Sequence, residues 1–572
     1  MKLHHGSSSA PPAAAAERKA VSGRRVKLRR LAGLTAFTGL LVWAFQRAVP
    51  SDGALVNLGG LRLLDDLAAT ALRPSLDADF LRVVLEATAT TLAFALLGTV
   101  GALVIGLIGG LVLSDVAWRH SLPWPVRTGR LVLRGLLVTV RSVHELVWAL
   151  LFVGLFGLDP LVAVLALALP FGAQSAQVFG ETFDAVPDTT LRALRALGAR
   201  PGAALAYALL PRTAPLLLSY SFYRLECALR SAVVLGIAGV GGLGFELIVS
   251  LQSRNWGEVW TLVAALLALA AAVELWSHHV RRDLAVVTCA DWSVGQERAR
   301  EEGRMPRGLS RRTRWSLAMT LPAVAAAWWW VGLSPAGLVS ARTRELGGQL
   351  LMDLWPPAFP AGGGRVLADA ALDTVSMAVL AMFVALLITV VVGPWASRPR
   401  ADRRATPAVA ARTAIWGAAR LLLLVLRSVP PTVWAVVALL AFFPGVVPGA
   451  LALGVYTGGI LGRLVAEAWE TMDLRPRDSL RTAGLPRPVS AMLAVGPPSA
   501  HHLVTYTLYR FEICVRDTAI VGVVGAAGLG RLLSERLAAF DFPVVSGILL
   551  ASLALSLLVE VLGRRIRRAL RA

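Results

Sequence analysis

Apolar segments long enough to cross a lipid bilayer recur along the 572-residue chain, separated by short polar stretches. A helix needs about 20 apolar residues to span the hydrocarbon core. We expect spans near 31–49, 82–113, 129–156, 159–179, 204–236 and 257–278, and again near 315–333, 366–393, 415–443, 447–468, 498–522 and 542–562. The pattern predicts an all-α polytopic membrane protein with about six transmembrane helices in each half.

The second half of the chain repeats the first. Residues 223–244 read YRLECALRSAVVLGIAGVGGLG, and residues 509–530 read YRFEICVRDTAIVGVVGAAGLG. Arg224 and Arg510 are separated by 286 positions, and so are Glu226 and Glu512. Both halves place their arginine-rich loops on the same predicted side, so we expect two parallel repeats and not inverted ones.

Basic residues also predict the domain organisation. An arginine-rich run ends at Arg30, directly before the first apolar segment, which the positive-inside rule places in the cytoplasm. We expect a disordered basic tail over 1–30, a first membrane unit over 31–280, a cytoplasmic linker over 281–314 and a second membrane unit over 315–572. Both termini are then cytoplasmic.

Composition narrows the function classes. Hydrophobic residues make up 56% of the chain and charged residues 16%, against about a quarter charged in soluble proteins. The net charge of +21 does not indicate nucleic-acid binding, because the arginines lie in short runs between apolar segments. The three cysteines have no metal-ligand spacing, and none of the three lysines follows a glycine, so no phosphate-binding loop for ATP is present.

Charged residues inside predicted spans are the first candidate site, because an ionisable group in a membrane is costly and marks function by default. Glu226 and Arg230 are four residues apart and are expected to pair on one helix face, whereas Arg224 and Arg510 lack an obvious partner. A guanidinium group matches phosphoryl geometry, which favours a pathway for an oxyanion. The candidate pathway residues are Arg141, Ser142, Arg224, Glu226 and Arg230 in the first unit and Arg427, Ser428, Arg510, Glu512 and Arg516 in the second.

Glycines close the fifth span of each unit. The run GVGGLG at 239–244 matches the dinucleotide fingerprint only formally, because no strand precedes it and Ala527 replaces its second glycine in the repeat. The recurring spacing predicts a close helix approach or a broken helix that acts as a hinge. The hinge glycines are Gly236, Gly239, Gly242 and Gly244, repeated as Gly522, Gly525, Gly528 and Gly530.

A loop between two spans carries a second repeated pattern. Gly198 is followed thirteen residues later by Pro211, and Gly484 by Pro497, inside an amphipathic segment. This segment resembles the coupling helix of ABC importer permeases, a short helix that lies in a groove of the ATPase subunit; an ordinary interfacial helix is the alternative. The coupling residues implied are Glu181, Gly198 and Ala199, and Glu467, Asp478 and Gly484. Arg192 stands where the second unit has Asp478.

Together these motifs resemble the permeases of phosphonate-type ABC importers. The segment RSVHELVWALLFVGLFGLDPL at 141–161 and both fifth-span segments carry the resemblance, which covers about 80–280 and 365–565. The second unit departs from it with Pro430 and Pro431, where the first unit has His144 and Glu145. The resemblance implies a type I ABC importer permease fold, with two permease units fused in one chain of a bacterial plasma membrane.

The same resemblance implies partners and a mechanism. We expect two copies of a cytoplasmic ABC ATPase, which bind ATP and Mg, and one extracytoplasmic substrate-binding protein or lipoprotein. The permease itself would bind no cofactor, metal or nucleic acid, and would carry no catalytic residue. Transport would proceed by alternating access, and the family's ligands include phosphonates, phosphite and phosphate.

Two other functions stay open from the residues alone. The chain is also compatible with an importer permease for another small solute, or with a stand-alone secondary transporter of twelve helices. The secondary transporter would work without an ATPase and leaves the repeated coupling segments unexplained. A membrane-embedded enzyme is disfavoured, because the sequence shows no histidine-rich cluster and no nucleophile with a repeated base.

Overall fold

The computed structural model describes residues 35–49, 55–116, 124–187, 189–283, 310–334, 336–398, 407–472, 475–494 and 496–571. The expected tail over 1–30 and most of the expected linker over 281–314 lie outside these residues. Throughout the described part, regular structure is helical, and a single isolated bridge joins Val56 to Phe442. The expectation of an all-α fold is confirmed.

The helices of the first unit follow a helical segment at residues 35–48. They are α2 (Leu58–Ala69), α3 (Ala78–Leu113), α4 (Trp124–Ser142), α5 (Glu145–Phe156), α6 (Pro160–Asp184), α7 (Thr189–Ala196), α8 (Pro201–Leu235), α9 (Leu243–Gln252) and α10 (Trp256–Asp283).

The second unit repeats this order after a longer N-terminal segment. Its helices are α12 (Arg311–Ala318), α13 (Thr320–Val331), α14 (Ala336–Val339), α15 (Ala341–Asp353), α16 (Gly363–Ala396), α17 (Pro407–Ser428), α18 (Pro431–Ala441), α19 (Val446–Thr471), α20 (Arg475–Thr482), α21 (Arg487–Ala494), α22 (Gly496–Val523), α23 (Leu529–Ala538) and α24 (Phe542–Arg571). Among the described residues, seven helices are long and apolar enough to cross a membrane, and α4 with α5 form an eighth if they are one span.

The third span of each unit is broken, and each of the apolar segments expected near 129–156 and 415–443 is divided into two helices. In the first unit, α4 and α5 meet at a bend of 95°. His144 caps the new helix, because its Nδ1 accepts a hydrogen bond from the backbone N–H of Leu146 at 3.2 Å. In the second unit Pro430 and Pro431 start α18, since a proline is tolerated in the first turn but not inside a helix.

Each unit is built around one tightly packed helix pair, α3 with α6 and α16 with α19. Small residues allow the close approach. A Cβ at Gly98 would lie 2.7 Å from the Cβ of Leu167, and one at Gly454 would lie 2.6 Å from the Cβ of Val384. These pairs form the frame on which the other helices of each unit are placed.

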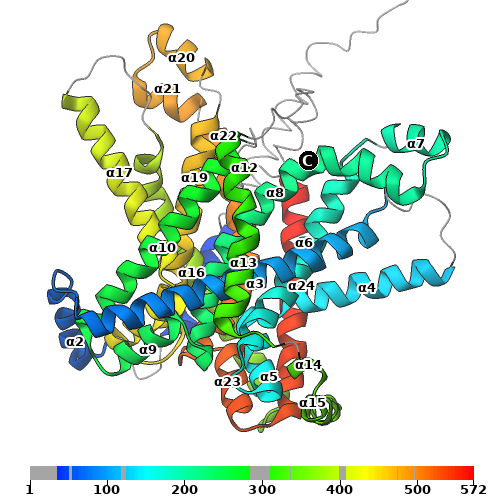
Figure 1. Cartoon of the computed structure of the whole chain (residues 1–572). Helices are drawn as coiled ribbons and strands as arrows, with labels where there is room; N and C mark the ends of the chain where they lie inside the picture. The colour runs from blue at the N-terminus through cyan, green and yellow to red at the C-terminus, as the bar shows by residue number, and fades with distance from the viewer. Residues whose placement is uncertain are drawn as a thin grey trace, which may run out of the picture.

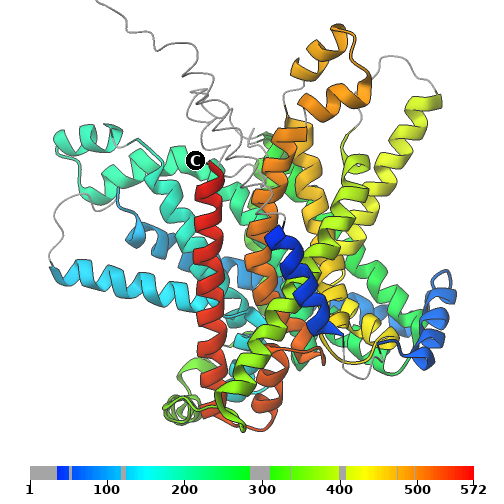
Figure 2. The same ribbon diagram turned by 180° about the vertical axis from the view of Figure 1, so that it is seen from behind.

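The first helix of each unit packs against the other unit. Residues 35–48 lie against α16, where the Arg47 Nε donates to Asp373 at 2.7 Å, and Figure 2 shows this helix in blue across the second half of the chain. In return α13 packs on α3, where the indole N–H of Trp330 donates to the hydroxyl of Thr90 at 3.2 Å. The two units are therefore interlocked.

Two equivalent apolar cores hold the units together. In the first core, α5 packs against α23 and α24 through residues that are almost fully buried, and in the second core α18 packs against α9 and α10. The first core contains Val147, Leu529, Leu533, Val545 and Ile548. The second contains Val433, Leu243, Leu247, Val259 and Leu262, each 286 positions from its counterpart. The interface thus has pseudo-twofold symmetry.

The two units have the same orientation. Figure 1 shows α7 of the first unit and α20 and α21 of the second projecting at one end of the molecule, on opposite sides. Helices α2 and α9 and helices α15 and α23 lie at the other end. The expected parallel repeat is confirmed.

Candidate functional site

The glutamates of the fifth spans pair with the last helix of their own unit. Glu226 lies 3.1 Å from Arg281 of α10, and Glu512 lies 2.8 Å from Arg567 of α24. The expected pairing of Glu226 with Arg230 on one helix face is therefore wrong, because packing of a neighbouring helix brings a closer cation.

Three further ion pairs cross between the units. Arg141 of α4 lies 3.0 Å from Glu560 of α24, and Arg427 of α17 forms the equivalent contact with Glu274 of α10. Arg463 also lies 2.7 Å from Glu274. Arg141 and Arg427, which we predicted as pathway cations, thus each contact an acid of the opposite unit.

The other two arginines predicted for the pathway have different surroundings. Arg516 donates to the backbone carbonyl of Arg141 in the other unit at 2.9 Å. Arg230 places its Nη2 3.5 Å from the Sγ of Cys227. Equivalent positions in the repeat are therefore used differently.

Arg224 is enclosed by aromatic rings. Its side chain is buried, its Nη2 donates to the hydroxyl of Tyr220, and its guanidinium carbon lies 4.8 Å from the centre of the Phe171 ring and 5.6 Å from that of Tyr223. No carboxylate among the described residues is within ion-pair distance of it, and its Nε has no hydrogen-bond acceptor. Cation–π attraction offsets part of the cost of burying this charge.

Arg510 is also buried but has an acid nearby. Its Nη2 lies 4.0 Å from the Asp517 carboxylate, so the expectation that it lacks a partner is wrong. The distance is too long for a hydrogen bond, and both Nε and Nη2 remain without an acceptor. Asp517 occupies the position that Ser231 has in the first unit.

A buried polar cluster surrounds Asp517. The Nε2 of His144 lies 3.3 Å from Glu145 and 3.7 Å from Asp517, and the hydroxyl of Ser231 donates to Glu145. Because the Nδ1 of His144 accepts a backbone hydrogen bond, its hydrogen must be on Nε2. The cluster combines side chains of α5 and α8 with one of α22.

The two predicted serines lie at the helix breaks. Ser142 is buried and donates to the carbonyl of Val138 at 2.7 Å, and Ser428 is buried as well. A cavity of about 40 Å³ adjoins Ser142 and His144, with walls that include Thr518 and Ser556 of the second unit. Its lining mixes hydroxyl groups with apolar side chains, and its volume suits about one ordered water.

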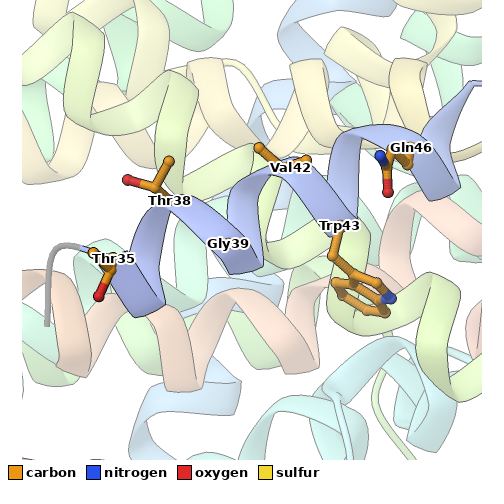
Figure 3. Close-up of a pocket in the computed structure, with 6 residues that line it drawn as sticks. All are labelled: Thr35, Thr38, Gly39, Val42, Trp43 and Gln46. Carbon is orange, nitrogen blue, oxygen red and sulfur yellow. The ribbon is translucent and has the colours of Figure 1, made fainter. Parts of the chain in front are cut away.

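A second hollow lies elsewhere. Figure 3 shows it along the helix of residues 35–48, where it is shallow and open. It is lined by Thr35, Thr38, Gly39, Val42, Trp43 and Gln46. None of these residues is charged, and we assign no site to it.

Each predicted coupling segment begins with a short helix, α7 in the first unit and α20 in the second, and both helices end in the same type of turn. Gly198 has φ +83° and Gly484 has φ +90°, the left-handed region that favours glycine. Gly198 donates to Arg195 at 3.0 Å, and Ala199 donates to Leu194 at 3.0 Å. The second unit repeats both bonds after α20.

Exposed apolar side chains accompany these turns. Leu197 is 84% exposed and Tyr207 77%, and in the second unit Met492 is 76% exposed. Such side chains at one end of the molecule are typical of a protein-binding surface.

The polar coupling residues differ between the units. Arg192 and Asp478 are both exposed, and Asp478 lies 2.7 Å from Arg477. Glu181 accepts from Gln177 at 2.8 Å, whereas Glu467 lies 2.6 Å from Arg463, the residue that replaces Gln177 in the repeat. At this position the second unit therefore has an ion pair, whereas the first unit has a hydrogen bond to a neutral side chain.

The glycine clusters lie where the fifth spans are broken. In the first unit α8 ends at Leu235, a π-helical turn covers Gly236–Val240, and α9 begins at Leu243. The hydroxyl of Thr91 accepts from the Leu243 N–H at 2.8 Å, and Thr374 caps Leu529 in the same way at 2.9 Å.

These glycines cannot be replaced freely. Gly242 and Gly528 have φ of +83° and +91°, and a Cβ on either would lie 2.6 Å from the capping threonine oxygen. Gly239 and Gly525 also have positive φ. A Cβ added at Gly236, Gly244, Gly522 or Gly530 would lie closer than 3.0 Å to backbone atoms. Movement at this break stays a prediction.

The sequence pattern did not point to Asp517, or to the charged residues in the last helix of each unit. Glu274 and Glu560, and Arg281 and Arg567, all obey the offset of 286. Applying that offset to every charge inside an apolar segment would have found them. Asp517 breaks the repeat, and only the structure shows what it contacts. Within the described residues no group of three or more His, Cys, Asp or Glu side chains could hold a metal ion.

Comparison with known proteins adds the family. The family model described as binding-protein-dependent transport system inner membrane component matches residues 124–285 and again 408–572. The chain is 29% identical over 481 residues to the phosphate-import permease protein PhnE of Mycolicibacterium smegmatis, covering 84% of each chain. It is 35% identical over 229 residues to the phosphite transport system permease protein PtxC of Stutzerimonas stutzeri, covering 40% of this chain and 80% of that one.

No solved structure matches the chain significantly. The two matched segments together cover more than half of the sequence and fall one in each unit. Each contains a broken third span, a predicted coupling segment and a glycine break. The chain is therefore a multi-pass membrane protein that belongs to the family of binding-protein-dependent transport system inner membrane components, with two copies of the family domain in one polypeptide.

Proposed function

We propose that this chain is the permease of an ATP-driven importer for phosphate, phosphite and phosphonate oxyanions. The observation that carries the proposal is the pair of buried guanidinium groups at equivalent positions, Arg224 and Arg510, each with hydrogen-bonding atoms that have no acceptor. A buried cation with unused donors suits a ligand that brings oxygen acceptors and negative charge.

The substrate class is supported by two independent facts. The relatives described above are named for phosphate import and phosphite transport. The arginines belong to the fifth-span segments, which pack beside the boundary between the units, where a central pathway would run.

The partners follow from the two ends of the molecule. We assign α7 and α20, with their glycine turns and exposed apolar side chains, to docking of two ATPase subunits, which supply the ATP and Mg chemistry. That end, the N-terminus and the C-terminus are then cytoplasmic. The opposite end, with α2 and α15, would receive one extracytoplasmic substrate-binding protein.

The interlocked architecture suits alternating access. Movement of α7 and α20 with the ATPases would be transmitted through α8 and α22, which follow them in the chain and carry Arg224 and Arg510. The glycine breaks at the ends of these helices would absorb the change in angle. Both arginines are buried in this state, so a pathway at their level would be closed.

Uptake competition tests the substrate class. Cells that depend on this transporter take up labelled phosphate, and unlabelled phosphite and an alkylphosphonate are expected to compete while an amino acid does not. Removal of the ATPase gene is expected to abolish uptake. Undiminished uptake without any ATPase would instead support the stand-alone secondary transporter, and no oxyanion uptake at all would overturn the proposal.

A further inference from the structure

A buried polar cluster joins the two units on one side of their interface. It contains His144, Glu145 and Ser231 of the first unit and Arg510 and Asp517 of the second. The repeat does not reproduce it, because Pro430 and Pro431 stand at the positions equivalent to His144 and Glu145, and Ser231 is itself the equivalent of Asp517. The cluster therefore occurs once in the molecule, although the fold around it is duplicated.

The hydrogen-bond donors around the two carboxylates show which acid has unused acceptor capacity. The imidazole of His144 has one hydrogen, on Nε2, because Nδ1 accepts from the backbone. The Nε2 of His144 lies 3.3 Å from one oxygen of Glu145, and the hydroxyl of Ser231 donates to the other oxygen. Asp517 lies farther from the same nitrogen, at 3.7 Å, and 4.0 Å from Arg510. Asp517 thus keeps acceptor capacity for another hydrogen.

The neighbouring guanidinium group has the opposite need. Arg510 is buried, with 7% of its surface exposed, and its Nε and Nη2 have no acceptor. A buried donor or acceptor without a partner destabilises the structure, and more so when the group is charged. A single ligand satisfies both residues if it offers oxygen acceptors to Arg510 and a hydrogen to Asp517.

We propose that Arg510 and Asp517 form a one-sided subsite that selects oxyanions carrying an acidic hydrogen, such as hydrogenphosphate or a hydrogenphosphonate. Arg510 binds the charged oxygens, and the Asp517 carboxylate accepts the P–OH hydrogen. Sulfate offers acceptors only and is repelled by the carboxylate, and a lipid phosphodiester lacks the hydrogen as well. This inference rests on the proposed function. It names the chemical feature, an acidic hydrogen on the oxyanion, by which the pathway would select its substrate.

The subsite is closed in this state. His144, Arg510 and Asp517 are all buried, and the cluster lies where α5 of the first unit contacts α22 of the second. An ion reaches it when these helices separate, and Ser231, at the equivalent position in the first unit, offers a hydroxyl and no charge.

The test is equilibrium binding to the purified full chain in lipid nanodiscs near neutral pH, with radiolabelled inorganic phosphate and radiolabelled sulfate as probes. We expect the unmodified chain to prefer phosphate. Asp517→Asn keeps the shape but replaces the carboxylate with a group that also donates, so the phosphate-to-sulfate preference should fall about 10-fold or more, as for loss of one buried polar contact. Asp517→Ser, which installs the residue of the first unit, should act similarly.

Four variants and one cell assay separate the outcomes. Arg510→Gln should abolish binding of both ions, and Arg531→Gln, at an exposed arginine of α23, should change neither. An unchanged preference in both Asp517 variants would overturn the subsite, and so would a chain that binds no phosphate while the intact transporter still imports it in cells. Absence of oxyanion uptake in cells would instead overturn the proposed function.

Discussion

Arg141 and Glu560 form an ion pair of 3.0 Å across the boundary between the two membrane units, and Arg427 and Glu274 repeat the contact from the opposite side. Both arginines are the second-last residue of a helix that ends at the break of a third span. Both glutamates lie in the last helix of the other unit. The two pairs therefore tie each break to the neighbouring unit.

Removing one partner of this pair should destabilise the assembled chain. Glu560→Gln leaves the half-buried Arg141 without its acid, and we expect a loss of about 2 kcal/mol, between the values for exposed and fully buried pairs. Thermal unfolding of the purified protein measures it. The exposed pair of Arg531 and Glu535 supplies the control, because Glu535→Gln should have little effect.

The charge-reversed double variant tests whether the contact itself matters. Arg141→Glu combined with Glu560→Arg should recover part of the stability that either single change loses. If the double variant is as unstable as the sum of the two, the ion pair contributes nothing of its own.

Loss of the central cations should reduce transport without disrupting assembly. We expect Arg224→Gln combined with Arg510→Gln to lower oxyanion uptake at least about 10-fold, because a charge-assisted hydrogen bond is typically worth about 1.5–3 kcal/mol. Co-purification of the ATPase subunits should be retained. Normal uptake by the double variant would show that these arginines do not serve the pathway.

Bulky residues at the coupling turns should uncouple ATP hydrolysis from transport. Gly198→Val and Gly484→Val force a β-branched residue into a left-handed conformation, which strains the turn that orients each short helix. We expect ATPase release or hydrolysis without uptake. Gly417→Ala, in a helical position with open space around it, is the matched control. A fully coupled double variant would contradict the docking assignment.

A methyl group at the helix break should be costly. A Cβ at Gly244 would lie 1.8 Å from the carbonyl oxygen of Val233, so the backbone must move, and Gly244→Ala should cost about 1–3 kcal/mol or more. Gly347→Ala, which meets no atom within 4 Å, should be neutral or stabilising. Equal melting temperatures for the two variants would show that the break tolerates the shift.

The sequence alone determined the duplication, the membrane location and the family. These follow from local features: the length of apolar segments, the constant offset of 286, and the glycines required where φ is positive. It also identified the fifth-span arginines, since an ionisable group inside an apolar helix is visible without knowledge of its neighbours.

Only the tertiary structure decided which groups meet. Helical spacing compares residues on one helix and therefore predicted Glu226 with Arg230, yet packing places Arg281 closer to Glu226. The same holds for Arg141 and Glu560, which are 419 residues apart. In a low-dielectric interior a charge pairs with whichever opposite charge the packing brings nearest. The periodicity of a single segment cannot predict which distant helices pack against it.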